Sequence, residues 1–202
     1  MTPRRRLLLA AGLLALVAVI GLFKYLGLFA PADALAMRIV AHLRGMPGAD
    51  GATWLSVWLA ELGDGGARLY IALLAGLFLA SAGRPRAMLW LLTAVVGMMI
   101  LNALMKLVFL APRPDVLEHL ALASGHSYPS GHAAGAMTLW GGIALLCRAP
   151  LATLFCLAMI LATGFSRVWL GVHWPSDVLG GWIEGTAGLL AMSLILPSRQ
   201  EG

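Results

Sequence analysis

Charge is scarce in this 202-residue chain. Only 11% of the residues are Asp, Glu, Lys or Arg, whereas 60% are hydrophobic and the mean hydropathy is +0.88. A soluble domain of this length could not bury so much apolar surface, so the composition excludes a water-soluble globular protein. The formal charge of +5 is not gathered into one basic patch, which argues against nucleic acid as a partner. We therefore expect the lipid bilayer to be the main solvent.

Cysteine is nearly absent, and metal-binding motifs are missing. Cys147 and Cys156 both lie in apolar segments, without a CxxC motif and without a cluster of His and Cys. This pattern excludes a disulfide framework and a zinc site, and it predicts two buried thiols. The sequence also has no carboxylate cluster of the kind that binds hard cations. We therefore expect no metal and no other cofactor.

A cleavable signal peptide is not expected either. Three arginines precede an apolar run from Leu7 to Leu22, and this combination is similar to a signal peptide. The run is long, however, and Lys24–Gly27 behind it is a poor small-residue cleavage site. We predict that the segment stays in the chain as its first membrane span.

Long apolar segments dominate the rest of the sequence, and a membrane-spanning helix needs about 20 such residues. We predict an all-α membrane protein with six transmembrane helices and short interfacial helices in the first outer loop. The chain shows no internal repeat, so we expect one domain over residues 1–202. The predicted spans are residues 7–29, 67–83, 87–110, 130–147, 151–170 and 176–196.

Basic residues indicate the orientation of these spans. If the N-terminus is cytoplasmic, one set of arginines lies on the same side: Arg4, Arg5, Arg6, Arg84, Arg86, Arg148 and Arg199. This agrees with the positive-inside rule, so we expect both termini on the cytoplasmic side of a bacterial inner membrane. Lys106, Arg113 and Arg167 lie toward the periplasmic or extracellular side, against the rule, and topology does not account for them.

The longest predicted connection, residues 31–66, contains two amphipathic stretches. Residues 33–43 carry apolar positions at helical spacing, and residues 53–62 include Trp54 and Trp58, four positions apart. Tryptophan favours the membrane interface, so both stretches are predicted to be interfacial helices. They either line a lateral entrance for a lipid or serve only as anchors.

The first of three polar strings joins Lys106 to Arg113 and Pro114. The prolines around Arg113 stop the preceding helix and stiffen its exit, which can return Arg113 toward Lys106. Two cations brought together repel unless an anion lies between them, and an arginine fork matches phosphate oxygens. Taken alone, Lys106 also suits a cation that snorkels to the headgroups.

The second string, Pro129–His132, opens a predicted span. Pro129 and Ser130 are ordinary helix-start residues, and Ser130 alone suits an N-cap. Gly131 lets an anion approach the free N–H groups of the helix start. His132 then lies in the first turn, where it can donate or accept a proton near neutral pH.

The third string runs from Ser166 and Arg167 through His173 to Asp177. His173 and Asp177 are four residues apart across a helix start, so the carboxylate can accept one ring N–H and leave the other nitrogen free. That arrangement favours a histidine nucleophile. Each residue of the three strings has an ordinary structural explanation by itself, but six ionisable groups at one membrane face indicate a functional site.

These strings resemble the signature of the type 2 phosphatidic acid phosphatases. That signature is a lysine, six residues and Arg-Pro, then Pro-Ser-Gly-His, then Ser-Arg, five residues, His, three residues and Asp. The sequence matches every position in the same order: Lys106, Arg113, Pro114, Pro129, Ser130, Gly131, His132, Ser166, Arg167, His173 and Asp177. The resemblance covers predicted spans three to six directly, and the six-span layout extends it over nearly the whole chain.

The resemblance implies a role for each residue. His173 attacks phosphorus and forms a phosphohistidine, Asp177 orients it, and His132 protonates the leaving oxygen and later activates water. The implied phosphate-binding residues are Lys106, Arg113, Ser130, Gly131 and Arg167. Because three cations then neutralise the phosphate, we expect turnover without a metal.

The function that follows from the resemblance is dephosphorylation of a membrane lipid phosphate or diphosphate. Undecaprenyl diphosphate, phosphatidylglycerophosphate, phosphatidic acid and lipid A phosphates are the candidate substrates. A lipid-to-lipid phosphotransferase that uses the same histidine remains an alternative, as does a non-catalytic lipid binder or transporter. Vanadate-dependent haloperoxidases share the fold but are soluble, so the composition argues against them. No pattern in the sequence indicates an oligomeric state.

Two loop histidines and one carboxylic acid lie near the signature without belonging to it. His119 and His126 are expected to be loop histidines. Glu184 lies inside the sixth predicted span, where a carboxyl group must be protonated or paired with a polar group of a neighbouring span.

Overall fold

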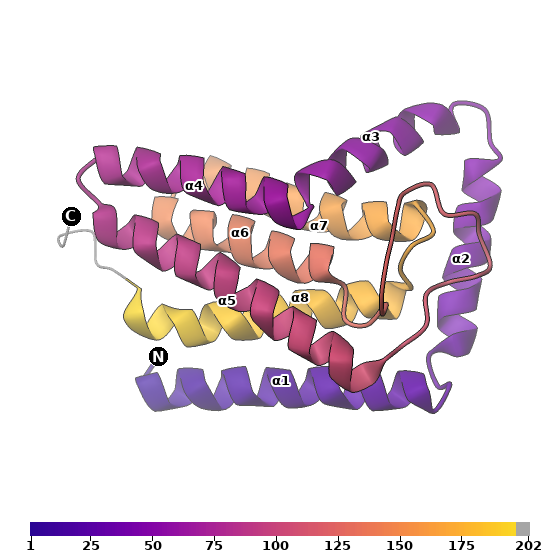
Figure 1. Ribbon diagram of the computed structural model, residues 1–202, viewed down its shortest axis with the longest axis horizontal. Coiled ribbons are helices and arrows are strands. Elements are labelled where there is room, and N and C mark those ends of the chain that lie inside the picture. The colour runs from indigo at the N-terminus through magenta and orange to yellow at the C-terminus, as the bar shows by residue number, and fades with distance from the viewer. Residues whose placement is uncertain (197–202) are drawn as a thin grey trace.

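The computed structural model describes residues 1–196, and all regular structure in this range is helical (Figure 1). The elements are α1 (Pro3–Tyr25), α2 (Ala30–Arg44), α3 (Ala49–Leu62), α4 (Gly65–Ser81), α5 (Pro85–Phe109), α6 (Gly131–Cys147), α7 (Pro150–Trp169), α8 (Pro175–Met192) and the 3-10 helix η1 (Ser193–Ile195). The predicted all-α class is confirmed. Arg199, which was expected on the cytoplasmic side, lies outside the described residues.

The number of full-length spans differs from the predicted six. Within residues 1–196, four helical segments are long and apolar enough to cross a membrane: α1, α5, α7 and α8 with η1. A fifth span results if α3 and α4 are counted as one, and α6 is apolar but has only 17 residues. The protein is thus a multi-pass membrane protein with four or five such spans, and the six-span count is not confirmed.

The break between α3 and α4 explains one part of this difference. Gly63 ends α3 and Asp64 caps α4 by accepting the N–H of Gly66 at 3.1 Å, so two adjacent capping residues separate the helices. The two helices meet at 68°. Residues 53–62, one of the two predicted interfacial helices, lie within α3, which forms one arm of this bent pair. Residues 33–43 lie within α2, as a helix was predicted there.

The bundle is arranged around α6, which packs against α4, α5, α7 and α8. Glycines of α8 permit the close approach of α6. A Cβ at Gly181 would lie 2.5 Å from the carbonyl oxygen of Ser130, and one at Gly185 would lie 2.7 Å from that of Ala134. Small residues at such crossings are typical of helices that pack within a bilayer.

The surface of the bundle is apolar and part of its interior is polar. Leu151, Leu154 and Phe155 of α7 are more than half exposed. In contrast, several charged or polar side chains are buried: Asp33, Arg68, Asn102, Ser127, Ser130, Arg167, His173, Ser176, Asp177 and Glu184. This distribution suits a lipid solvent, and it places the polar groups where they must satisfy one another.

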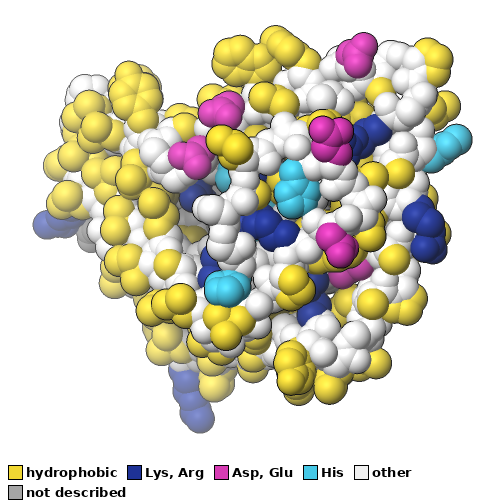
Figure 2. All heavy atoms as spheres, turned by 45° about the vertical axis from the view of Figure 1, so that its right-hand side comes forward, with side chains coloured by type: hydrophobic (Ala, Val, Ile, Leu, Met, Phe, Trp, Pro, Cys, Tyr) yellow, Lys and Arg dark blue, Asp and Glu magenta, His cyan; other side chains and the backbone are white. Residues whose placement is uncertain are grey.

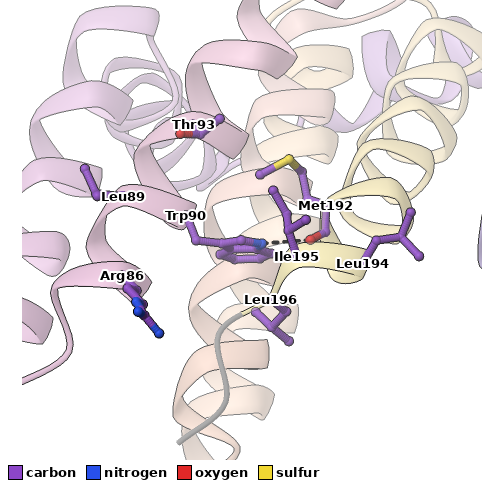
Figure 3. A pocket seen from close by; sticks show the side chains of 8 residues that line it. All are labelled: Arg86, Leu89, Trp90, Thr93, Met192, Leu194, Ile195 and Leu196. Atoms are coloured by element: carbon purple, nitrogen blue, oxygen red, sulfur yellow. Dashed lines mark hydrogen bonds between the residues drawn. The ribbon is translucent and has the colours of Figure 1, made fainter. Parts of the chain in front are cut away.

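The two ends of the bundle differ in structure. At one end, which we call the α2 end, α2 crosses the helices and the long α5–α6 connection folds over their termini (Figure 1). The other end, which we call the α4–α5 end, contains the short turn between those two helices. A cavity of about 500 Å³ there is lined mainly by apolar side chains, together with Arg86 and Thr93. The Trp90 N–H donates to the Met192 carbonyl at 2.8 Å (Figure 3).

Candidate active site

All three polar strings lie at the α2 end. Figure 2 shows basic and histidine side chains gathered near the middle of this face, with acidic side chains around them. The strings meet because α5 and α7 end there while α6 and α8 begin there.

The return between α7 and α8 presents His173. Gly171 adopts a left-handed φ of +77°, and a Cβ at this position would lie 2.9 Å from the Glu118 carbonyl oxygen. The N–H of Leu120 donates to the Leu170 carbonyl at 3.0 Å, which ties the return to the α5–α6 connection. The position of His173 is therefore set by two segments that are distant in sequence.

His173 and Asp177 form a buried pair. His173 Nδ1 lies 3.4 Å from Asp177 Oδ2 and 3.3 Å from Ser127 Oγ. The same carboxylate oxygen accepts the Ser127 hydroxyl at 2.5 Å and the Trp174 N–H at 2.8 Å. These contacts favour the tautomer in which Nδ1 carries the proton, so Nε2 keeps its lone pair.

The environment keeps the His173 ring neutral. The pKa of His173 is lowered from 6.5 to about 4, chiefly by burial and also by the charges of Lys106 and Arg113, while the hydrogen bond and charge of Asp177 act in the opposite direction. At neutral pH the free Nε2 can therefore act as a nucleophile without losing a proton first.

Arg113 lies against the free nitrogen of His173. Its Nη1 is 3.4 Å from His173 Nε2 and donates to the Val172 carbonyl at 2.8 Å. Its other nitrogens donate to the carbonyls of Ser124 at 2.7 Å and Gly125 at 3.1 Å. A group bound at Nε2 would thus meet a planar cation directly.

Lys106 reaches the same loop from α5. Its Nζ donates to the carbonyl oxygens of His126 at 2.6 Å and Ser127 at 3.3 Å. Lys106 and Arg113 therefore converge on residues 124–127, in agreement with the expected return of Arg113 toward Lys106. The His119 ring bonds the carbonyl of Pro114 at 2.7 Å, within its own loop.

Hydrogen bonds from several elements hold the start of α6 in place. Ser130 caps the helix, with its hydroxyl 3.5 Å from the Ala133 N–H, and it is fully buried. Asn102 donates to the Pro129 carbonyl at 3.3 Å, and Arg68 donates to the Gly131 carbonyl at 2.6 Å. A Cβ at Gly131 would lie 2.7 Å from Asn102 Oδ1, so a larger residue would displace this amide.

His132 faces the end of α3. Its Nε2 lies 3.1 Å from the Ala60 carbonyl oxygen, which favours the tautomer with the proton on Nε2. Nδ1 is then the nitrogen that is free to exchange protons. His132 also lies within electrostatic range of His173 and Arg167.

Arg167 is a buried cation with an unfilled donor. It is 3% exposed, and its Nε finds no hydrogen-bond partner within residues 1–196. A buried guanidinium nitrogen without an acceptor is costly unless an anion can reach it. Together with Arg113, Lys106 and the α6 N-terminus, Arg167 makes this end of the bundle suited to a phosphate group.

Several polar residues of the site carried no signal in the sequence. Ser127 and Asn102 are ordinary polar residues in a loop and a span, and Lys24 is indistinguishable from a snorkelling lysine at a span end. Glu184 was expected to be protonated or paired, and it accepts the Asn102 amide at 2.7 Å. Within residues 1–196, no three His, Cys, Asp or Glu side chains converge so as to hold a metal ion.

The fold and the site define a class: a multi-pass helical membrane protein with a histidine–aspartate pair and converging cations at one end of the bundle. Comparison with known families identifies the family to which the chain belongs. The sequence profile of the PAP2 superfamily matches residues 87–201, more than half of the chain, and the protein belongs to this superfamily.

Curated relatives match shorter parts of the chain. The undecaprenyl-diphosphatase BcrC of Bacillus subtilis (strain 168) is 38% identical over 96 residues, which cover 46% of this chain and 48% of the relative. An undecaprenyl-diphosphatase of Sulfolobus acidocaldarius is 44% identical over 63 residues, which cover 30% and 29% of the two chains. The chain thus aligns with about half of the first relative's length and less than a third of the second's.

A solved structure matches the fold over nearly the whole chain. The crystal structure of a transmembrane PAP2-type phosphatidylglycerolphosphate phosphatase from Bacillus subtilis superposes with a TM-score of 0.78. The match covers 92% of this chain and 93% of that chain at 22% sequence identity. Because the superfamily profile matches only residues 87–201, a structural match over 92% of the chain extends well into the helices that precede this region.

Proposed function

We propose that the protein is an integral-membrane lipid phosphatase that works through a phosphohistidine intermediate. The observation that carries the proposal is the geometry of His173. Its Nδ1 faces Asp177 and Ser127, while Nε2 faces Arg113 at 3.4 Å. This is the arrangement that a histidine needs to attack a phosphorus atom beside a charge-neutralising group.

In the first step, the His173 Nε2 lone pair forms a bond to phosphorus while the bond between phosphorus and the lipid oxygen breaks. His132 enters this step as an imidazolium with its Nε2–H on the Ala60 carbonyl, and it gives its Nδ1 proton to the departing oxygen. Asp177 stabilises the positive charge that develops on the His173 ring. The phosphoryl oxygens are bound by Lys106, Arg113, Arg167, Ser130 and the Gly131 N–H.

In the second step, water attacks the phosphohistidine. His132 takes a proton from this water as the P–N bond breaks, and inorganic phosphate leaves with His173 restored to its neutral form. Both steps depend on positioning and on charge neutralisation, which three cations provide. We therefore propose that turnover needs neither a metal nor another cofactor.

The substrate class that we propose is a lipid with a terminal phosphate or diphosphate. The relatives named as undecaprenyl-diphosphatases favour undecaprenyl diphosphate, and the structural relative favours phosphatidylglycerophosphate. Phosphatidic acid and lipid A phosphates fit the same phosphate site. The arginines at the α4–α5 end support an orientation with the α2 end at the periplasmic or extracellular face of a bacterial membrane.

The test is phosphate release by detergent-purified protein in EDTA, with a panel of these four lipids. We expect release from at least one lipid, undiminished by EDTA and lost in His173→Ala. His119→Ala is the matched control, because it removes an exposed histidine from the same end and should leave release unchanged.

Other results would redirect the proposal. Abolition of activity by EDTA would contradict metal-independent turnover. Transfer of phosphate to an added acceptor lipid in preference to water would indicate the phosphotransferase. No release from any lipid, or equal release from His173→Ala, would favour a non-catalytic lipid binder.

A further inference from the structure

Lys24, at the end of α1, contacts the carboxylate that holds His173. Its Nζ lies 3.0 Å from Asp177 Oδ1, 2.6 Å from Ser176 Oγ and 3.4 Å from Asp33 Oδ2. Ser176 and Asp33 accept hydrogen bonds from the ammonium group, and Asp177 Oδ1 faces it as an ion-pair partner. The Lys24 side chain is only 10% exposed, so it does not extend to a headgroup region as a snorkelling lysine does.

Asp33, from α2, completes the cluster. It accepts the Ser176 N–H at 3.0 Å and the Ser176 hydroxyl at 2.5 Å, and it is 4% exposed. Ser176 directly precedes Asp177 in the first turn of α8. Asp33 and Lys24 therefore hold the turn that carries Asp177 from two separate helices.

The two oxygens of Asp177 are used differently. Oδ2 faces three groups, the Ser127 hydroxyl, the Trp174 N–H and the His173 ring. Oδ1 makes no hydrogen bond within residues 1–196 and has the Lys24 ammonium as its ion-pair partner. Without Lys24, this oxygen would be a fully buried charge that lacks its counter-ion.

The charges of the cluster also match the proposed reaction. Asp33, Lys24 and Asp177 together have a formal charge of −1, which becomes balanced when the His173 ring gains positive charge. Loss of Lys24 would leave a charge of −2, which favours the protonated ring too strongly. Loss of Asp33 would leave no net charge and would disfavour that ring.

We propose that Lys24 and Asp33 are positioning residues for the nucleophile: Lys24 orients Asp177 and balances its charge, and Asp33 limits how much of the Lys24 charge acts on that carboxylate. The proposal rests on the proposed function, because it assigns the nucleophile to His173. It extends the site to α1 and α2, which lie outside residues 87–201.

Other charged or titratable groups also act on His173, and the test must keep them unchanged. They come from α5, the α5–α6 connection, α6 and α8: Lys106, Arg113, His132 and Asp177. Arg167 of α7 lies in range of Arg113 and His132. The cleft of about 660 Å³ beside Lys24 and Asp33 is otherwise lined by apolar or uncharged residues of α1, α2, the end of α5 and Trp174.

The test compares Lys24→Met and Asp33→Asn, with Arg38→Met as a control that removes an exposed cation from α2. One readout is the pH dependence of kcat/KM for lipid dephosphorylation. The other is the protonation of His173, followed by NMR of the histidine-labelled protein in detergent with His173→Ala to assign the signal. The second readout needs no substrate.

We expect shifts in opposite directions. In Lys24→Met the unbalanced carboxylates raise the pKa of His173, so the acid limb of kcat/KM moves to higher pH by at least about half a unit. In Asp33→Asn the limb moves to lower pH. At the wild-type optimum, we expect kcat to fall about tenfold or more in Lys24→Met, with a smaller change in KM. Arg38→Met should behave as wild type.

Lys24→Met can also destabilise the protein. Asp33→Asn keeps the shape of its side chain, so a shift of the pH profile in this second variant reports the change of charge. Lower melting temperatures with an unmoved His173 titration, or shifts of both variants in the same direction, would overturn the proposal. If the wild type releases no phosphate while the NMR shifts appear, the proposed function fails but the coupling of Lys24 and Asp33 to His173 stands.

Discussion

At the α4–α5 end the helices meet mainly through apolar packing, whereas at the α2 end they meet through buried charges. Leu79, Trp90, Leu91 and Leu146 form a cluster at the first end. At the second end, charged and polar side chains pair inside the bundle, among them Lys24 of α1, Asp33 of α2 and Asp177 of α8. Polar groups are costly at membrane depth, so the end that retains them is the one where we expect chemistry.

The comparison predicts that substitutions at the two ends differ in kind. At the α2 end, substitutions of the buried polar groups should alter activity and pH dependence, because we propose that these groups orient the nucleophile or bind the phosphate. At the α4–α5 end they should alter stability alone. The predictions that follow test this difference, from the largest expected effect to the smallest.

The largest effect is expected from Asp177→Asn. The amide keeps the shape of the side chain but no longer stabilises a positive His173 ring, and it can present an N–H where the ring N–H needs an acceptor. We expect kcat to fall between about a hundredfold and ten-thousandfold with a much smaller change in KM. Steady-state kinetics measure this, and an activity within a factor of about three of wild type would contradict the assigned role.

His132→Ala should have an effect that depends on the leaving group. If His132 protonates the departing oxygen, loss of its ring should slow hydrolysis of alkyl phosphates such as lipids by about a hundredfold or more. An aryl phosphate with an acidic phenol needs little protonation, so its first step should be slowed much less. Equal losses for both substrates in stopped-flow measurements would indicate that His132 only binds phosphate.

The pH dependence of the wild type should show an acid limb far below the ordinary histidine range. Because burial lowers the pKa of His173 to about 4, the ring is neutral above that pH and becomes inactive as the pH falls through it. We therefore expect that protonation of His173 does not lower kcat/KM until the pH falls below about 5. If an acid limb near pH 6.5 persists when each of the other histidines is replaced, it belongs to His173. That result would contradict a buried, neutral nucleophile.

The smallest effect on activity is expected from Trp90→Phe at the α4–α5 end. This change removes the hydrogen bond from the indole N–H to the Met192 carbonyl while it keeps most of the aromatic packing (Figure 3). We expect a loss of about 1 kcal/mol in stability and no measurable change in kcat/KM. Thermal unfolding in detergent and the kinetic assay measure the two quantities on one sample. A marked loss of activity at unchanged stability would remove the distinction between the two ends.

Much of the fold was readable from local patterns. Pro85, Pro150 and Pro175 lie in the first turns of α5, α7 and α8, and the apolar runs behind them gave the helices. The break at Gly63 and Asp64 falls between the predicted helix over residues 53–62 and the predicted span over residues 67–83, and α6 matches the predicted span 130–147. The angle of 68° between α3 and α4 was not predicted, because capping residues mark the end of one helix and not the direction of the next.

The site divides in the same way. His173 and Asp177 are close in sequence, and the spacing predicted their contact. Lys24 and Asp33 join Asp177 from more than 140 residues away, and no spacing rule links positions so far apart. The pairing of Asn102 with Glu184 is another such contact, for which only the cost of an unpaired carboxyl group in a span gave a hint.

The central claim is that His173 carries the phosphoryl group, and trapping that intermediate tests it most directly. Purified protein would be mixed with a lipid labelled in its terminal phosphate, quenched in alkali within milliseconds, and analysed by mass spectrometry of its peptides. The account predicts a transient phosphohistidine at position 173 that forms and decays at rates consistent with turnover. Phosphate release without any phosphorylated His173, or with the label on another residue, would contradict it.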